Sequence, residues 1–262
     1  MAADAKAKVT TERDGAILWV TIDRPEVLNA LDPEAHRGLA AAFDAFAADA
    51  SLRVAVITGR GDKAFCVGSD LKARAATNAD DHPDTGFAGL THRFDLAKPV
   101  IAAVNGLAIG GGVEIVAAAD LAIAADHAAF ALPEPRVGLA ALGGGGLQRL
   151  ARHLPLKYAM DLVLTGRRID AAEAQRIGLV NSVVPAGELR AKVRATAEQI
   201  IAGAPLAIAA SKQVMLQSLA HADLADALRA HYPAAERMLA SEDAREGQRA
   251  FVERRPPSWQ GR

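Results

Sequence analysis

Two glutamates, twenty residues apart in the chain, have residue types and neighbours that suit proton transfer. Glu114 closely follows a glycine triplet at 110–112 that is typical of the start of a helix. Glu134 lies between Pro133 and Pro135, which fix its backbone and exclude a helix interior. Paired carboxyl groups can divide acid and base work, and free N–H groups at a helix start stabilise an oxyanion. The pattern indicates proton transfer next to a carbonyl group.

These residues need a framework of strands and helices to bring them together. Apolar runs at 17–22, 54–58, 99–104 and 121–124 predict buried strands. Asp32 followed by Pro33 is typical of a helix start, with the aspartate as the cap and the proline in the first turn. A further helix is expected to carry Glu114. Strands that alternate with helices over the first two-thirds of the chain predict an α/β fold.

The last third of the chain has no strand signal after Pro185. Helical patterns cover residues 188–202, 205–219, 224–239 and 242–254. We therefore expect an α/β core over residues 1–195 and a helical region over residues 196–262. The leucines of this region are too many to be buried within it, so it is expected to contact other subunits of an oligomer.

Composition limits the classes of protein and of partner. The 262 residues are 51% hydrophobic, enough for one large globular domain with or without an appendage. The formal net charge of −1 argues against a nucleic-acid or membrane-surface partner. A single cysteine, Cys66, excludes an intrachain disulfide and suits a reducing compartment. With no apolar run of about 18 residues and no apolar signal core at the start, a cytoplasmic location is expected.

Several motifs of other enzyme classes are absent from the sequence. No Gly-Lys-Ser/Thr phosphate loop occurs, and neither glycine cluster completes Gly-x-Gly-x-x-Gly, because Ile115 and Gln148 occupy the last positions. There is no His-Glu-x-x-His metal motif and no Gly-x-Ser-x-Gly nucleophile turn. A dinucleotide-dependent oxidoreductase therefore stays only as an outside alternative.

An ordered set of motifs covers nearly the whole chain. In sequence order it contains KAFCVGSDLK at 63–72, KPVIAAVNG at 98–106, GGGVE at 110–114, FALPE at 130–134, LTGRRI at 164–169 and AFVERR at 250–255. In this order and spacing the set resembles the enoyl-CoA hydratase/isomerase (crotonase) superfamily. The resemblance implies a spiral of β-β-α units followed by helices, a homotrimer or dimer of trimers, an acyl-CoA substrate, and no metal or redox cofactor.

The resemblance also implies roles for particular residues. By motif position, the backbone N–H groups of Ser69 and Gly111 form an oxyanion hole, with the glycine giving a thioester room to approach. Glu134 is assigned to proton exchange at C2 of the acyl group, and Glu114 to holding and activating water. Coenzyme A is expected to contact two segments, through Val27, Leu28, Cys66, Gly68, Asp70, Leu71 and Lys72.

Enoyl-CoA hydratase is the main functional interpretation, with alternatives left open. A carnitinyl-CoA dehydratase-like enzyme is a close alternative, since FALPE, TGRR at 165–168, HYP at 231–233 and the WQGR ending resemble that branch. A double-bond isomerase is less well supported because both glutamates are present, and a non-catalytic acyl-CoA-binding member would be expected to have lost them. The acyl pocket wall is expected from residues 73–95, a polar stretch in which His82 is typical of a solvated loop.

Overall fold

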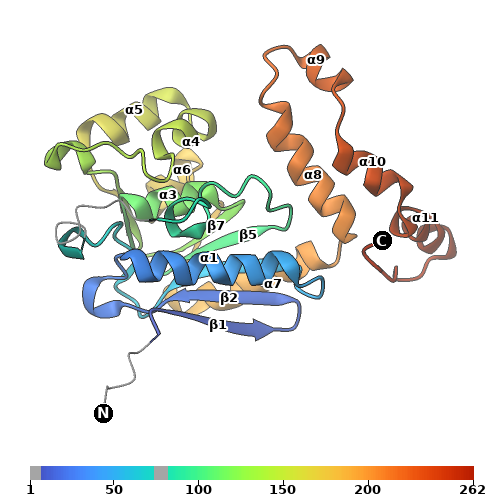
Figure 1. The fold of residues 1–262 in the computed structure, drawn as a ribbon, viewed down its shortest axis with the longest axis horizontal. Helices are drawn as coiled ribbons and strands as arrows, with labels where there is room; N and C mark the ends of the chain where they lie inside the picture. Colours follow the sequence, from blue (N-terminus) through green and yellow to red (C-terminus); the bar gives the residue numbers. More distant parts are fainter. Residues whose placement is uncertain (1–6, 74–81) are drawn as a thin grey trace.

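The computed structural model describes residues 7–73 and 82–262, and the described chain forms two β-sheets with helices packed around them (Figure 1). The larger sheet has the strand order β1-β2-β3-β5-β7-β10 and the smaller one the order β4-β6-β8-β9. The strands of the larger sheet are β1 (Val9–Asp14), β2 (Ile17–Ile22), β3 (Val54–Gly59), β5 (Val100–Val104), β7 (Leu121–Ala125) and β10 (Ser182–Val184). Those of the smaller sheet are β4 (Ala64–Cys66), β6 (Leu107–Ile109), β8 (Ala129–Ala131) and β9 (Ile169–Asp170).

From β3 to β8, successive strands alternate between the two sheets. β3, β5 and β7 lie parallel in the larger sheet, and the strand that follows each of them lies in the smaller sheet. β6 leads directly into helix α3 (Gly111–Ala118), which completes a β-β-α unit. The predicted α/β fold with a spiral of such units is confirmed. The spiral brings the ends of β4, β6 and β8 side by side, so that segments distant in sequence meet there.

The core follows from the apolar runs that predicted the strands. β5 is buried at every position, as expected for a strand covered on both faces. Helix α1 (Pro33–Ala48) starts as predicted, with the Asp32 side chain accepting a hydrogen bond of 2.9 Å from the Ala35 N–H. Its Phe43 and Phe46 are fully buried, which stabilises the fold by about 1.5–3 kcal/mol for each side chain.

The remaining helices cover the sheets or extend from the core. They are α4 (Gly146–His153), α5 (Leu156–Thr165), α6 (Ala171–Ile177), α7 (Leu189–Ile201), α8 (Pro205–Ser218), α9 (Leu224–Arg229), α10 (Pro233–Ala240) and α11 (Glu242–Glu253). The prediction of a single helix over 224–239 is wrong, because this segment forms two helices, α9 and α10. Pro233 lacks an N–H group and holds Tyr232 in extended backbone, which ends the helical path before it.

The boundary predicted between residues 195 and 196 lies inside α7. Leu189, Val193 and Ala197 of this helix pack in one cluster with Trp19 and Ile101 of the larger sheet. The chain leaves the α/β core only after Ile201, where α8 turns away at 101°. In the described part of the chain no single helix is long and apolar enough to cross a membrane, and this bent pair passes that test only as a pair, by length and composition.

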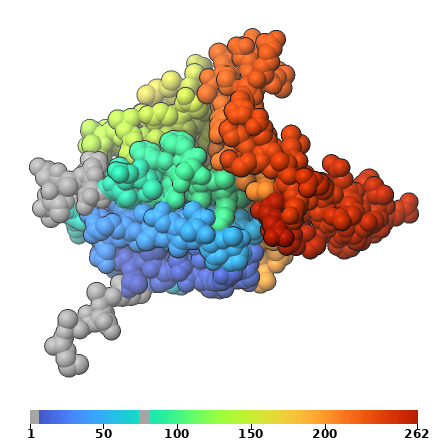
Figure 2. Space-filling model, turned by 45° about the vertical axis from the view of Figure 1, so that its right-hand side comes forward, coloured from blue at the N-terminus to red at the C-terminus, as the bar shows by residue number. Residues whose placement is uncertain are grey.

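Helices α8 to α11 stand away from the core (Figures 1 and 2), and they expose apolar side chains. A cavity of about 590 Å³ is lined by residues of both α8 and the core. The exposed apolar side chains of these helices include Met215, Leu216, Leu219, Leu224, Leu228, Leu239, Phe251 and Val252. We expect another copy of the chain to cover them, giving a particle of three or six times 27.3 kDa by light scattering. A monomer at micromolar concentration would rule this out.

Candidate active site

Glu114 is a buried carboxyl group with backbone donors around it. It lies in the first turn of α3, is 3% exposed, and its Oε1 accepts a hydrogen bond of 2.9 Å from the Gly146 N–H. Burial raises the pKa of Glu114, while the N–H groups of Gly146 and Gly144 and the positive charge of Arg149 lower it. Burial has the larger effect, so the pKa of Glu114 is raised overall, and the start of helix α4 offsets part of the cost of ionising the carboxyl group.

Two glycines of the run at 143–146, Gly144 and Gly146, pack so closely on Glu114 that they leave no space for side chains. A Cβ on Gly144 would lie 2.6 Å from the Glu114 Cβ, and one on Gly146 would lie 3.0 Å from its Cγ. Helix α4 begins at the last of these glycines, Gly146. Their contact with Glu114 is a functional feature that sequence analysis missed. A glycine run signals a close approach, but not which residue approaches.

Glu134 is the second carboxyl group, and it is less well paired. It follows β8 and begins a short 3-10 helix, η3 (Glu134–Val137). Its Oε2 is buried and has no hydrogen-bond partner in the described parts of the chain. Burial raises the pKa of Glu134, and the negative charge of Glu114 raises it further. The two carboxyl groups thus interact, and burial raises the pKa of both.

Two backbone N–H groups lie on adjacent segments of the site. The Gly111 N–H is at the first position of α3, where no intrahelical acceptor exists. Leu31 bonds to the residues on both sides of Ser69, at 2.8 Å to the Gly68 carbonyl and 2.8 Å from the Asp70 N–H. Within residues 7–73 and 82–262, neither the Ser69 nor the Gly111 N–H donates to a protein acceptor. A Cβ on Gly68 would lie 3.1 Å from the Gly111 nitrogen, so the two segments are adjacent.

The reason for glycine at position 111 differs from the expected one. A Cβ there would lie 2.4 Å from Cζ of Phe87, so the ring and not a thioester occupies that direction. Phe87 lies in η2 (Phe87–Gly89) and packs against His36 at 4.6 Å between ring centroids. The His36 Nδ1 in turn accepts from the Ala88 N–H at 3.0 Å. Replacement of Gly111 would therefore first displace Phe87.

His82 is a further residue near the site that sequence analysis assigned to a solvated loop. Its ring lies 6.1 Å from that of His36, which itself packs against Phe87 beside Gly111. The polar residues around His82 in the sequence do not indicate that its ring lies close to His36. Residues 74–81, which belong to the expected pocket wall, lie outside the described residues. Among the described side chains, no group of three His, Cys, Asp or Glu could hold a metal ion.

The residues expected to contact coenzyme A separate into exposed and buried groups. Val27 and Leu28 are each 37% exposed, Leu71 is 54% exposed, and Lys72 is exposed. The pairing of Leu31 with Ser69 brings these two segments side by side, so their exposed side chains are available to a ligand.

The other three expected contacts have structural partners. Cys66 is fully buried, and burial raises its pKa to about 12, which leaves an unreactive thiol. Gly68 is buried beside Gly111. Asp70 is paired with Arg24 at 3.0 Å, so its carboxylate is already occupied.

Substitution of Ser69 by Ala is expected to be mild, because the proposed donor at this position is the main chain. We expect kcat to stay within about threefold of the wild type, far from the 10²–10³-fold cost of losing an oxyanion donor. Steady-state kinetics with an enoyl-CoA would measure this. A Ser69→Ala enzyme that is inactive but has unchanged thermal stability would make the hydroxyl a catalyst and contradict the backbone interpretation.

The raised pKa of Glu134 predicts a pH-dependent effect on stability. The folded-state pKa lies above the unfolded value of 4.5, so the group stabilises the fold fully below that pH. This contribution is lost as pH rises through the folded pKa. We therefore expect the melting temperature of Glu134→Gln, relative to the wild type, to increase from pH 5 to pH 8. A difference in melting temperature that stays constant or falls from pH 5 to pH 8 would show that burial does not raise the pKa of this carboxyl group.

The fold and the site together define the class of protein. Two sheets joined by a spiral of β-β-α units carry a pair of interacting glutamates beside free backbone N–H groups. Residues 12–262 match the enoyl-CoA hydratase/isomerase family. The chain belongs to this family, and the resemblance inferred from its motifs is confirmed.

Comparison with known proteins identifies similar enzymes. Carnitinyl-CoA dehydratase from Salmonella arizonae is 48% identical over 258 residues, which are 95% of this chain and 97% of that protein. The protein of the same name from Salmonella typhi is 47% identical over 259 residues, with the same coverage of both chains. The crystal structure of enoyl-CoA hydratase from Mycobacterium tuberculosis is 40% identical, with a TM-score of 0.92, and covers 98% of this chain and 100% of that one. The chain is thus similar to enzymes of hydratase and dehydratase type.

Proposed function

We propose that the chain is a hydro-lyase that reversibly adds water across the α,β double bond of an enoyl-CoA thioester. The different hydrogen bonding of the Glu114 and Glu134 carboxyl groups supports this proposal. The Glu114 Oε1 accepts a hydrogen bond from the Gly146 N–H, which stabilises the carboxylate, and we assign this residue as the base. Glu134 has a buried oxygen without a hydrogen-bond partner among the described residues and a pKa raised by burial, and we assign it as the acid. Addition of water needs one group of each kind.

The proposed hydration uses the two glutamates together with the two backbone N–H groups. The Glu114 carboxylate accepts a proton from water as the water oxygen forms a bond to C3. The electron pair of the double bond moves toward the thioester, whose oxygen is stabilised by the N–H groups of Ser69 and Gly111. C2 then takes the proton of Glu134, giving the 3-hydroxyacyl thioester, and a proton passing from Glu114 to Glu134 restores the pair. These steps use only carboxyl and N–H groups of the chain, and the carboxyl groups titrate as a pair.

The test follows the absorbance of the conjugated enoyl thioester together with the mass of the product. We expect a trans-2-enoyl-CoA to lose this absorbance and gain the mass of one water. A double-bond isomerase would move the double bond without gaining water. A non-catalytic member would bind the thioester and leave it unchanged, so the three possibilities give different products.

For the acyl group, we propose a carnitinyl-CoA type substrate, a 3-hydroxyacyl thioester with a quaternary ammonium group on C4. The support is the 48% identity to a carnitinyl-CoA dehydratase over nearly the whole of both chains, against 40% for the enoyl-CoA hydratase structure. The test compares kcat/KM for dehydration of carnitinyl-CoA and of 3-hydroxybutanoyl-CoA. We expect a preference of more than about tenfold for carnitinyl-CoA, the order that pocket contacts provide. The opposite preference would favour a simple enoyl-CoA hydratase.

A further inference from the structure

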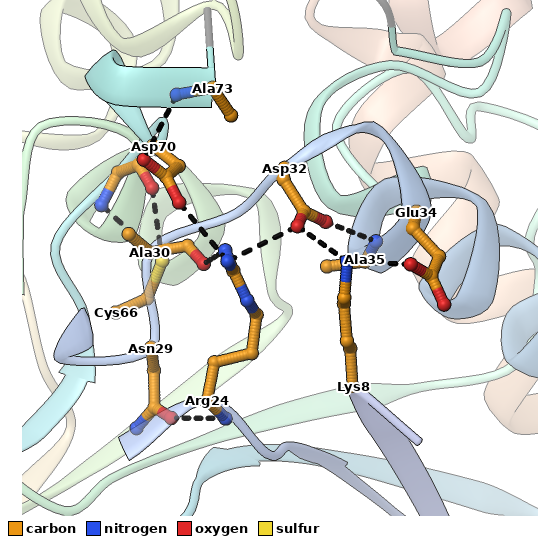
Figure 3. Close-up of polar contacts among 11 residues, drawn as sticks. Lys8, Arg24, Asn29, Ala30, Asp32, Glu34, Ala35, Cys66, Asp70 and Ala73 are labelled. Atoms are coloured by element: carbon orange, nitrogen blue, oxygen red, sulfur yellow. Dashed lines mark hydrogen bonds and ion pairs between the residues drawn. The ribbon is translucent and has the colours of Figure 1, made fainter. Parts of the chain in front are cut away.

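Arg24 is a buried cation that joins three parts of the chain (Figure 3). Its Nη2 lies 3.0 Å from Oδ2 of Asp70 and 3.1 Å from Oδ2 of Asp32. Its Nη1 donates to the Ala30 carbonyl. The guanidinium thus connects the turn after β2, the cap of α1 and the loop that carries Ser69. None of the chemistry proposed above uses this side chain.

The turn after β2 has a backbone that needs to be held in place. Leu28 and Asn29 have φ values of +54° and +58°, in the left-handed region that costs free energy for residues other than glycine. The Asn29 Oδ1 accepts from the Arg24 N–H at 3.1 Å, and its Nδ2 donates to the Ala64 carbonyl at 2.7 Å. Arg24 therefore contacts this turn through both its backbone and its side chain.

The turn leads directly to the segment that orients Ser69. Leu31 bonds to both neighbours of Ser69, and Asp70, the next residue in the loop, is paired with Arg24. We propose that Arg24 is a positioning residue that holds the loop at 66–70 so that the Ser69 N–H faces the thioester oxygen. This inference rests on the proposed function, because the thioester oxygen is part of it.

The planar guanidinium group of arginine suits this position better than the ammonium group of lysine. A guanidinium presents several donors in fixed directions, whereas an ammonium group on the same backbone cannot reach Asp70, Asp32 and the Ala30 carbonyl together. Loss of an oxyanion donor lowers kcat by about 10²–10³-fold. A donor that is misplaced rather than lost is expected to cost less, on the order of 10-fold to 10²-fold.

The experiment compares Arg24→Lys with a matched control in the same ion network. The control is Lys8→Met, because the Lys8 Nζ lies 2.7 Å from Asp32 and also pairs with Glu34, not with the loop at 66–70. The probe is a conjugated aromatic enoyl-CoA, whose absorbance moves to longer wavelength when its carbonyl is polarised by hydrogen bonds. Steady-state kcat and KM are measured with an enoyl-CoA that the wild type hydrates.

We expect Arg24→Lys to lose most of the absorbance shift and to lower kcat on the order of 10-fold to 10²-fold. KM should change less than about threefold, because mainly transition-state binding is lost. Lys8→Met should keep both the shift and kcat. If Arg24→Lys does not fold, Asp70→Asn is the second variant, with a smaller loss in the same direction expected. An absorbance shift as large as that of the wild type in Arg24→Lys, or in Asp70→Asn where that variant is needed, would overturn this inference. The proposed function would not be affected by that result. A wild-type chain that gives no shift would contradict the proposed function and this inference with it.

Discussion

Replacement of Glu134 by Gln is expected to lower kcat for hydration on the order of 10²-fold or more, the usual cost of losing a general acid or base. Glutamine keeps the size of the side chain but cannot donate a proton to C2. The Oε2 atom of Glu134 is buried and unpartnered in the described structure, so the substitution breaks no side-chain hydrogen bond to that oxygen. Steady-state kinetics and acyl-CoA binding should show a loss in kcat with little change in affinity.

The same loss is expected for Glu114→Gln, because the amide cannot accept the proton of water. Its Oε1 can still accept from the Gly146 N–H, so the start of α4 should remain in place. Glu198→Gln is a suitable control, since it alters an exposed glutamate on α7 that pairs with Arg194. If both active-site variants hydrated a good substrate at nearly the wild-type rate, the assignment of the pair would be wrong.

Gly144→Ala is expected to lower kcat by about 10²-fold, the order that a misplacement of about 1 Å can cost. The new Cβ would lie 2.6 Å from the Glu114 Cβ and 2.9 Å from its Oε2, so the carboxylate must move. The Gly144 N–H, which favours the ionised form of Glu114, would move with it. Kinetics on the folded variant, with its melting temperature as a check of the fold, would measure this effect.

The matched control for this prediction is the neighbouring glycine. A Cβ on Gly143 meets nothing within 4 Å, and this residue is exposed. Gly143→Ala carries the same chemical change one residue away and should keep wild-type kcat. Equal activity of the two variants would show that the close packing of the glycine loop on Glu114 does not matter for catalysis.

The sequence alone determined the local features and the family. The strands at 17–22 and 54–59 follow from apolar runs, and the start of α1 from Asp32 and Pro33, because these signals depend on neighbours in the chain. The types and settings of Glu114 and Glu134 were enough to indicate proton transfer. The break before Pro233 was also a local signal, but the helical spacing of the surrounding leucines obscured it.

Only the tertiary structure decided how these features meet. Gly146 donates to Glu114 across 32 positions, and Phe87 fills the space beside Gly111. Arg24 reaches Asp70 across 46 positions, and α7 packs on the sheet across the boundary expected near residue 195. Contacts between residues so distant in the chain leave no periodic pattern in the sequence. They arise because the two sheets alternate along the spiral and bring the loops after β4, β6 and β8 together.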